Sequence, residues 1–296
     1  MAGFGTNSTW AYLEALSALG TLATFDALSL HSYRVGGPES VLADFARIRA
    51  LAPNTPILSG EWGWTTCEPS RGATNCPASA LADEALQAKW LARQWLTNAL
   101  AAVNVSIFYD YVDDCADASD RECRFGVTHA PFANASVPHA PKPAFSAALS
   151  LQAHLGGSEL LGRIDAAETA VYVLRFAADV LAAWSADGTP TASCAVPAVQ
   201  KADCGFYGIT RQECLARGCC FGPANASGPQ CFLTAQNFTR TASFDVGVRD
   251  GDGVRCWRVV GLAPLDGEMG SVCAVRGRLN VTVDDGVRLL VPRLES

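Results

Sequence analysis

Six of the chain's 12 cysteines lie within 38 residues, between Cys194 and Cys231. The segment reads SCAVPAVQKADCGFYGITRQECLARGCCFGPANASGPQCF. A stretch this short cannot bury enough apolar surface to fold by itself, so we expect disulfide bonds to hold it together. Zinc is a weaker alternative because the segment contains no histidine, and spacing alone leaves the pairing of the cysteines open.

The order of residues in this segment resembles a P-type (trefoil) domain. The matching features are DCGFYGIT, then C-x4-CC-F, then CF, and the match covers residues 191–235. The resemblance implies the disulfides Cys194–Cys220, Cys204–Cys219 and Cys214–Cys231. Trefoil domains include carbohydrate binders that usually place an aromatic residue just before the last cysteine, where this chain has Gln230. A carbohydrate-binding module and a protease-resistant spacer therefore both stay open.

The other six cysteines fall into three close pairs. Loop length predicts the disulfides Cys67–Cys76, Cys115–Cys123 and Cys256–Cys273, with free buried thiols as the alternative. Six N-x-S/T sequons accompany them, at Asn7, Asn104, Asn134, Asn225, Asn237 and Asn280. Unless the sequons are coincidental, these features predict a secreted or secretory-lumen glycoprotein. No signal peptide is visible at the N-terminus, so we expect an N-terminally incomplete chain.

Charge and hydropathy argue against a nucleic-acid partner and against a membrane-spanning segment. The net charge is −7, the pI is about 5.1, and no run of Lys and Arg occurs, so nucleic acid is not an expected partner. No apolar segment reaches the roughly 20 residues that a transmembrane helix needs, so we expect no membrane span. The oligomeric state cannot be read from these features.

The first half of the chain alternates between helical and strand patterns. Helices are predicted over 8–20, 38–51, 79–102 and 143–155, and short apolar strands over 25–31, 56–62 and 105–112. Apolar strands separated by helices predict parallel βαβ units with both faces of the sheet covered.

From about residue 157 the pattern changes to alternation with period two. Strands are predicted within 171–177, 179–186, 241–248, 256–264 and 277–292, which together indicate an antiparallel β domain. The predicted organisation is an α/β region over 1–156, a β domain over 157–190 and 236–296, and the cysteine-rich domain inserted at 191–235.

Polar and aromatic side chains follow the three predicted parallel strands. The strand ends carry His31 and Tyr33 in SLHSYR, Glu61 in SGEWGW, and Tyr109 and Asp110 in FYDY. Core packing does not require such residues, whereas the carboxyl ends of parallel strands are where barrel enzymes place functional groups. A carboxylate beside tryptophans also suits sugars, whose C–H faces stack on aromatic rings.

These stretches resemble the last third of a clan A glycoside hydrolase. FDALSLHSYR, PILSGEWGW, IFYDYVDD, RFGVTH and PKPAFSA occur in the expected order. The resemblance implies a partial TIM barrel made of the last three βα units, with Glu61 as the nucleophile that ends the seventh strand. It makes His31 and Tyr33 supporting residues from the sixth strand, and it assigns to the sugar subsites Trp62, Trp64, Tyr109 and Asp110.

Each assignment has a structural alternative. Glu61 could be a capping or salt-bridging acid, His31 a structural histidine, and Asp110 a structural hydrogen-bond acceptor. A run of four aspartates is expected to be a solvated loop rather than a metal site: Asp113, Asp114, Asp117 and Asp120.

The resemblance also shows what this chain lacks. A retaining glycosidase needs two carboxylates about 5–5.5 Å apart. In clan A the second is the glutamate of an Asn-Glu pair that ends the fourth strand, and this sequence contains no Asn-Glu dipeptide. Asp110 is a poor substitute because its strand lies on the wrong side of Glu61. The chain offers three strands where a barrel needs about eight.

The sequence therefore predicts a secreted retaining glycoside hydrolase that acts on an oligo- or polysaccharide, needs no cofactor or metal, and is inactive in this form. One alternative is a secreted carbohydrate-binding or mucus-associated trefoil protein whose barrel remnant is not catalytic. A non-functional gene fragment is another. The sugar, the linkage and endo versus exo action are left open.

Overall fold

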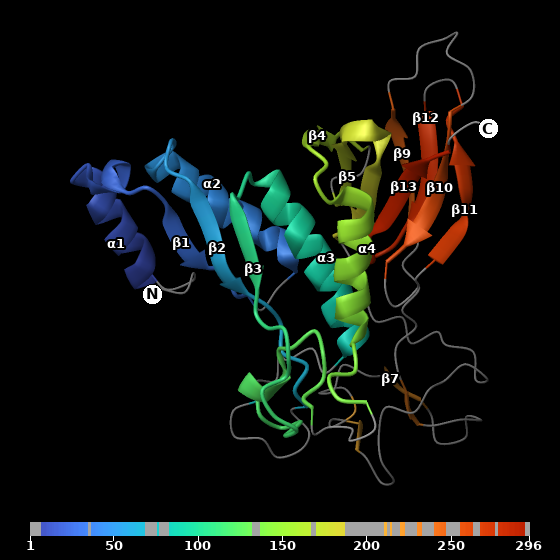
Figure 1. The fold of residues 1–296 in the computed structure, drawn as a ribbon, viewed down its shortest axis with the longest axis horizontal. Helices are drawn as coiled ribbons and strands as arrows, with labels where there is room; N and C mark the ends of the chain where they lie inside the picture. Colours follow the sequence, from blue (N-terminus) through green and yellow to red (C-terminus); the bar gives the residue numbers. More distant parts are fainter. Residues whose placement is uncertain are drawn as a thin grey trace.

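A computed structural model describes most of the 296-residue chain. The described residues are 7–34, 37–68, 76, 83–131, 137–166, 170–186, 210–211, 214, 220–222, 230–232, 240–246, 255–262, 267–275 and 278–293. Figure 1 shows a small sheet at one side, a β sandwich at the other, and the helices α3 (Glu84–Leu100) and α4 (Pro143–Leu155) between them. None of the described helices is long and apolar enough to cross a bilayer.

The small sheet is parallel, as the sequence predicts. Its strands are β1 (Leu28–His31), β2 (Ile57–Trp62) and β3 (Val105–Phe108), in the order β1-β2-β3. β1 is shorter than expected because Phe25, at 42% exposure, lies outside the sheet. β3 ends at Phe108 rather than at residue 112, so Tyr109 and Asp110 lie in the loop that follows the strand.

Two helices and two 3-10 turns pack beside β1 and β2. They are α1 (Asn7–Ala18), η1 (Thr21–Thr24), η2 (Pro38–Ser40) and α2 (Val41–Leu51). Val41, Phe45 and Ile48 recur on one face of α2 and are at most 1% exposed. They pack with Leu13 of α1 and Ile57 of β2, so this spacing buries the predicted face of each helix.

The helix α3 begins later than the pattern suggests. Asp83 has an extended backbone, with φ of −142°, and its side chain accepts a 2.8 Å hydrogen bond from the Ala85 amide. This is the geometry of an N-cap, which ends the helix on its N-terminal side. Residues 79–82 of the predicted helix lie outside the described part of the chain. The predicted bounds of α4 match the structure.

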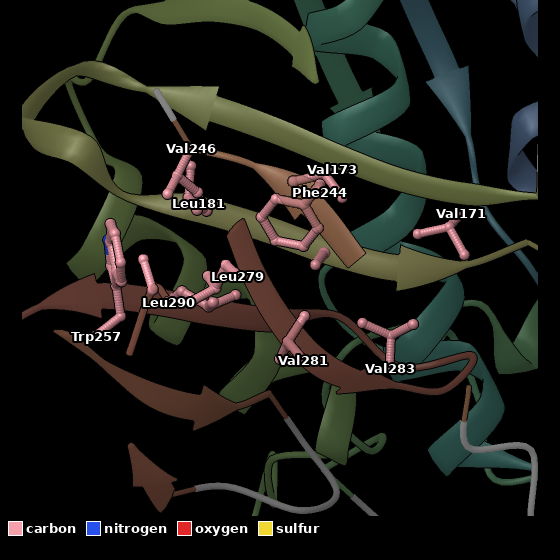
Figure 2. Close-up of a cluster of buried hydrophobic side chains, with 12 residues drawn as sticks. Val171, Val173, Leu181, Phe244, Val246, Trp257, Leu279, Val281, Val283 and Leu290 are labelled. Carbon is pink, nitrogen blue, oxygen red and sulfur yellow. The ribbon is translucent and has the colours of Figure 1, made fainter. Parts of the chain in front are cut away.

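The sandwich consists of a six-stranded antiparallel sheet and a two-stranded sheet. The larger sheet has the order β11-β10-β13-β6-β5-β4, formed by β11 (Gly267–Cys273), β10 (Cys256–Gly261), β13 (Arg288–Pro292), β6 (Leu181–Ser185), β5 (Val171–Phe176) and β4 (Leu160–Ile164). The smaller sheet pairs β12 (Arg278–Val283) with β9 (Arg240–Asp245). Figure 2 shows the core between them, where Phe244, Leu279 and Val281 meet Val173 and Leu290.

The strand β6 departs from the predicted alternation. All five of its residues are buried because the strand lies between two apolar layers. Leu181 and Ala183 face the core shared with β9 and β12, whereas Ala182 and Trp184 face α3 and α4. A strand covered on both faces loses the period-two signature that identifies half-exposed strands.

Four predicted disulfides lie in described residues, and the structure contains them. Cys67–Cys76 and Cys115–Cys123 close the loops after β2 and β3. Cys256–Cys273 joins β10 to β11 at directly paired positions. In the cysteine-rich segment Cys214–Cys231 is formed, next to the pair β7 (Cys220–Phe221) and β8 (Cys231–Phe232). The remaining pairs, Cys194–Cys220 and Cys204–Cys219, cannot be placed because Cys194, Cys204 and Cys219 lie outside the described residues.

The predicted glycosylation sites are only partly described. Asn104 and Asn280 are exposed, and the Asn104 Oδ1 accepts a hydrogen bond from the Ile57 amide. Asn7 is the first residue of α1. Three sequons lie outside the described residues: Asn134, Asn225 and Asn237.

A buried ion pair ties α3 to both halves of the molecule. Arg93 of α3 donates to both carboxylate oxygens of Glu39, from Nε at 2.8 Å and from a terminal nitrogen at 2.6 Å. Trp184 of β6 donates its indole hydrogen to the same carboxylate at 2.7 Å. The Arg93 side chain is 2% exposed and that of Glu39 is 9% exposed, so these two charges depend on each other.

Replacing Glu39 by Gln should destabilise the fold strongly. Removal of one partner leaves the Arg93 guanidinium buried without a counter-charge, which costs about 3–5 kcal/mol. The measurement is the free energy of unfolding in urea. Glu14→Gln is the matched control, because Glu14 pairs with Arg47 in solvent and such pairs contribute about 0.2–1 kcal/mol. Equal losses in the two variants would contradict this role of Glu39.

Candidate active site

The carboxyl ends of β1 and β2 bring His31 and Glu61 side by side. The pairing runs in step from Leu28 with Ile57 to Leu30 with Ser59, and then shifts so that His31 pairs with Glu61. The strand β2 therefore carries one extra residue, Gly60, which is a β-bulge.

The bulge decides which way Glu61 points. Without it, strict alternation would turn Glu61 toward the helices together with Ile57 and Ser59. With it, Glu61 shares a face with His31, and Trp62 turns into the core. A Cβ atom at Gly60 would lie 2.4 Å from the Ser29 Oγ but 3.8 Å from the nearest backbone atom, so a side chain there requires only that the Ser29 hydroxyl turn.

Two donors converge on one oxygen of the Glu61 carboxylate. The Nδ1 of His31 lies 3.0 Å from the Glu61 Oε2, and the Tyr33 hydroxyl donates to the same oxygen at 3.2 Å. The Glu61 side chain is 36% exposed, compared with 19% for His31. The structure thus brings together the three residues that the sequence predicts as nucleophile and supports, and it leaves the carboxylate accessible.

The environment keeps the Tyr33 phenol protonated. Burial raises its pKa above the usual range, and the negative charge of Glu61 and the hydrogen bond to it raise the pKa further. A protonated phenol is a permanent donor, so Tyr33 can hold the carboxylate in one orientation at any pH at which the protein works.

Phe125 is a site residue that the sequence did not single out. It is buried, and its ring contacts those of Tyr33 and Tyr109 edge to face, with centroids 5.9 Å and 5.5 Å apart. The ring therefore fixes the position of Tyr33 beneath Glu61 and joins the loop after β3 to the site. Its only sequence signal is its place in the RFGVTH stretch.

The assignment of Trp62 and Trp64 to sugar subsites is wrong. Trp62 is 0% exposed and Trp64 is 6% exposed. Both rings pack against the helix layer, where Trp62 contacts Trp95 and Trp64 contacts Trp90. The Trp62 indole donates to the Ser106 Oγ at 2.9 Å. The bulge turns Trp62 away from the face that Glu61 occupies.

The loop after β3 meets the loop after β2 beside the site. The Tyr109 amide donates to the Trp62 carbonyl at 2.7 Å. A Cβ atom at Gly63 would lie 2.0 Å from the Tyr109 carbonyl oxygen, so only glycine fits this contact. Tyr109 and Asp110 are both partly exposed. The Asp110 carboxylate accepts a hydrogen bond from the Tyr111 amide, which favours a structural role for this acid.

The expectation of a solvated aspartate loop is wrong for Asp113. Its side chain is fully buried, and its Oδ1 lies 2.7 Å from the Nζ of Lys142, which is also fully buried. The Gly126 amide donates to the same oxygen at 2.9 Å, and Arg124 approaches the other at 3.3 Å. Burial lowers the pKa of Lys142, against the opposing effect of Asp113. Asp113 therefore links residues 124–126, which flank Phe125, to Lys142 at the start of α4.

The face of the small sheet that carries Glu61 is uncovered by the described residues. We call it the open face; it also carries Ser29, Leu58, Val105 and Ile107. Val105 and Ile107 are 46% and 50% exposed. Their strand neighbours Ser106 and Phe108 point the other way and contact α3. A parallel sheet normally has both faces covered.

Removing the charge of Glu61 should lower the pKa of Tyr33. In Glu61→Gln the burial remains, but the repulsion between a phenolate and the carboxylate is lost. The check is the phenolate absorbance during alkaline titration, taken as the difference between proteins with and without Tyr33→Phe. That difference should appear at lower pH in the Glu61→Gln background than in the wild-type background. Identical titrations would show that Glu61 does not act on Tyr33.

Comparisons with known proteins give a family-model match for one segment and a likeness in fold for nearly the whole chain. Residues 194–234 match the model of the trefoil (P-type) domain. The chain is 43% identical over 44 residues to trefoil factor 3 of Felis catus and 43% identical over 49 residues to that of Homo sapiens. These matches cover 15% and 17% of this chain, and 55% and 61% of those proteins.

Nearly the whole chain resembles part of a solved enzyme in fold. A family 39 glycoside hydrolase from Bacteroides cellulosilyticus WH2 superposes with a TM-score of 0.56 at 16% identity. The superposition covers 98% of this chain and 49% of the enzyme, so this chain spans about half of that enzyme's length. The chain therefore combines a trefoil (P-type) domain with the fold of part of a glycoside hydrolase.

Proposed function

We propose that Glu61 is the nucleophile of a retaining glycoside hydrolase. The observation that carries the proposal is the pair of contacts to one carboxylate oxygen, from His31 at 3.0 Å and from Tyr33 at 3.2 Å. Both contacts hold the carboxylate at the carboxyl end of a parallel strand, where barrel enzymes act. The second oxygen is left for the substrate.

The three parallel strands are the last three of a (β/α)8 barrel. The open face supports this, because Val105 and Ile107 are apolar residues at positions that a closed barrel buries in its interior. The coverage of about half of the family 39 enzyme agrees with it. In the closed barrel Glu61 faces a cavity lined by the strand ends, with Tyr109 and Asp110 at its rim.

In the proposed reaction the Glu61 carboxylate acts as nucleophile in two steps. A Glu61 oxygen attacks the anomeric carbon, the bond to the leaving-group oxygen breaks, and a second carboxylic acid donates a proton to that oxygen. Water, deprotonated by the same second group, then attacks the glycosyl ester and releases Glu61. His31 and Tyr33 keep the attacking carboxylate oriented through both steps.

The second carboxylate belongs to a part of the barrel that this chain does not include. We do not assign this role to Asp110, which lies on the loop after β3 and accepts a hydrogen bond from the neighbouring Tyr111 amide. The chain by itself is therefore expected to bind a glycan weakly and not to turn it over.

A carbohydrate-binding role for the trefoil domain is a second proposal. It is supported by the match of residues 194–234 to the trefoil model. Gln230, at the position where trefoil carbohydrate binders usually have an aromatic residue, is exposed and could contact a ligand. Glycan-array binding that survives Glu61→Gln and is lost in Gln230→Ala would support this role. Binding that ignores Gln230 would argue against it.

The enzymatic proposal makes a prediction for two forms of the protein. The purified chain should not hydrolyse aryl glycosides, since the proton donor is missing. A longer protein that adds five βα units, one ending in Asn-Glu, should hydrolyse them with retention, as followed by NMR of the first-formed sugar. In that protein Glu61→Gln should lower kcat on the order of 10⁶-fold, as the loss of a covalent nucleophile does.

Glu14→Gln serves as the control in the longer protein, because Glu14 is exposed on α1 and pairs only with Arg47 among the described residues. It should leave kcat unchanged. Hydrolysis by the short chain that Glu61→Gln abolishes would refute the missing-donor argument, and inversion of the product would refute the nucleophile assignment.

A further inference from the structure

We propose that the β sandwich carries a second ligand site, for a small ring that bears an oxyanion, such as a carboxylated or sulfated monosaccharide. The site is an open cavity of about 630 Å³ on the six-stranded sheet, lined by Ala178, Val180, Arg258, Val291, Pro292 and Arg293. It lies on the sandwich, whereas Glu61 lies on the small sheet, with α3 and α4 between them (Figure 1). It is independent of the proposed glycosidase site.

Four arginines lie in this region, and two of them share the carboxylate of Asp179. Asp179 accepts a 2.5 Å hydrogen bond from a terminal nitrogen of Arg175 and another from Arg255. The two arginine charges lower the pKa of Asp179, against the effect of burial. These three residues bind one another, and none of them lines the cavity.

The other two arginines share one distant carboxylate. Arg258 and Arg293 lie 3.9 Å and 4.0 Å from the two oxygens of Glu268, beyond hydrogen-bond distance. Their side chains are 45% and 54% exposed. Two guanidinium groups thus face a single carboxylate, so the cavity keeps a local positive charge in a chain whose net charge is −7. Guanidinium groups bind carboxylates and sulfates through paired hydrogen bonds.

The rest of the lining is apolar and suits the face of a ring. Val180, Val291 and Pro292 contribute carbon atoms to the lining. Arg258 pairs directly with Val291 across β10 and β13, so the cation and the apolar surface share one face of the sheet. A ring with an acidic group can therefore rest its C–H face on the apolar surface while the oxyanion contacts the guanidinium groups.

The cavity wall is held in a strained but firmly fixed conformation. Ala178 and Asp179 have φ of 59° and 58°, which residues other than glycine rarely adopt. The Asp179 carboxylate is held by the two arginines described above, and its carbonyl accepts a 3.0 Å hydrogen bond from the Trp257 indole. The Cys256–Cys273 disulfide fastens β10 to β11 beside it. Strained backbone that is held in place by its surroundings clusters at binding sites. Here it keeps the cavity wall in one conformation before a ligand binds.

The test is isothermal titration calorimetry of the full chain with four probes: glucuronate, glucose 6-sulfate, glucose and sodium sulfate. Either acidic sugar should bind more tightly than glucose and sodium sulfate, and its affinity should fall as salt is added, because the arginines are exposed. Preference for glucuronate identifies a carboxylate site, and preference for glucose 6-sulfate identifies a sulfate site.

Arg258→Ala with Arg293→Ala should weaken binding of the acidic sugar at least tenfold. The matched control is Arg47→Ala with Arg278→Ala, which removes the same charge from exposed positions on α2 and β12 and should change the affinity less than twofold. Should the first double variant not fold, as judged by its unfolding midpoint, Arg293→Ala alone takes its place, because Arg293 lies just after the last strand.

Three results would overturn the proposal. Equal losses in the two double variants would mean that only net charge matters. Binding of sodium sulfate as tight as that of the acidic sugars would mean that the apolar lining is not used. Loss of binding in Glu61→Gln would place the ligand at the glycosidase site instead.

Discussion

The pairing of β1 with β2, shifted by one residue at Gly60, is the constraint on which the rest of the candidate site depends. Strict alternation along β2 would place Glu61 among the apolar side chains beneath the sheet and would expose Trp62. The shift reverses both positions: it sets the carboxylate opposite His31 and makes Trp62 the centre of the core against α3 and α4. The same extra residue therefore buries Trp62 in the core and places Glu61 at the candidate site.

The helix α3 connects the small sheet to the sandwich by packing against both. Leu91 on one side packs with Trp62, and Leu96 on the other packs with the six-stranded sheet. The buried ion pair of Arg93 with Glu39 also connects them, because the Glu39 carboxylate accepts a hydrogen bond from the Trp184 indole of the sandwich. The loops after β2 and β3 are held by two disulfides and by the ion pair of Asp113 with Lys142. Glu61 therefore lies on a supported strand end rather than on a free loop.

Much of this could be predicted from local pattern. Apolar strands between helices predicted the parallel sheet, and the resemblance to clan A glycoside hydrolases implied that His31 and Tyr33 lie against Glu61, as they do. The failures have two physical causes. Trp62 was misplaced because a bulge inverts alternation without changing composition, and Trp64, in the loop after β2, is buried against Trp90 of α3. Asp113 was misplaced because its partner Lys142 lies 29 residues away, and pairing at that distance leaves no local signal.

The strand β11 shows a related limit of sequence patterns. Its GEMGSVC sequence contains two glycines and few β-branched residues, so nothing in its composition marks a strand. It forms because β10 offers an edge and because Cys273 lies opposite Cys256, where the disulfide closes. Long-range pairing decided the structure here, as it did for Asp113.

The central claim is that Glu61 becomes covalently bonded to the sugar. Its most direct test uses a protein that adds five βα units, one ending in Asn-Glu, to this chain. That protein is treated with an activated 2-deoxy-2-fluoro glycoside, which slows release of the glycosyl-enzyme, and the adduct is mapped by tandem mass spectrometry of proteolytic peptides. The account predicts one added sugar, on Glu61 within the PILSGEWGW segment. An adduct on any other carboxylate, or turnover with no adduct and with inversion at the anomeric carbon, would contradict it.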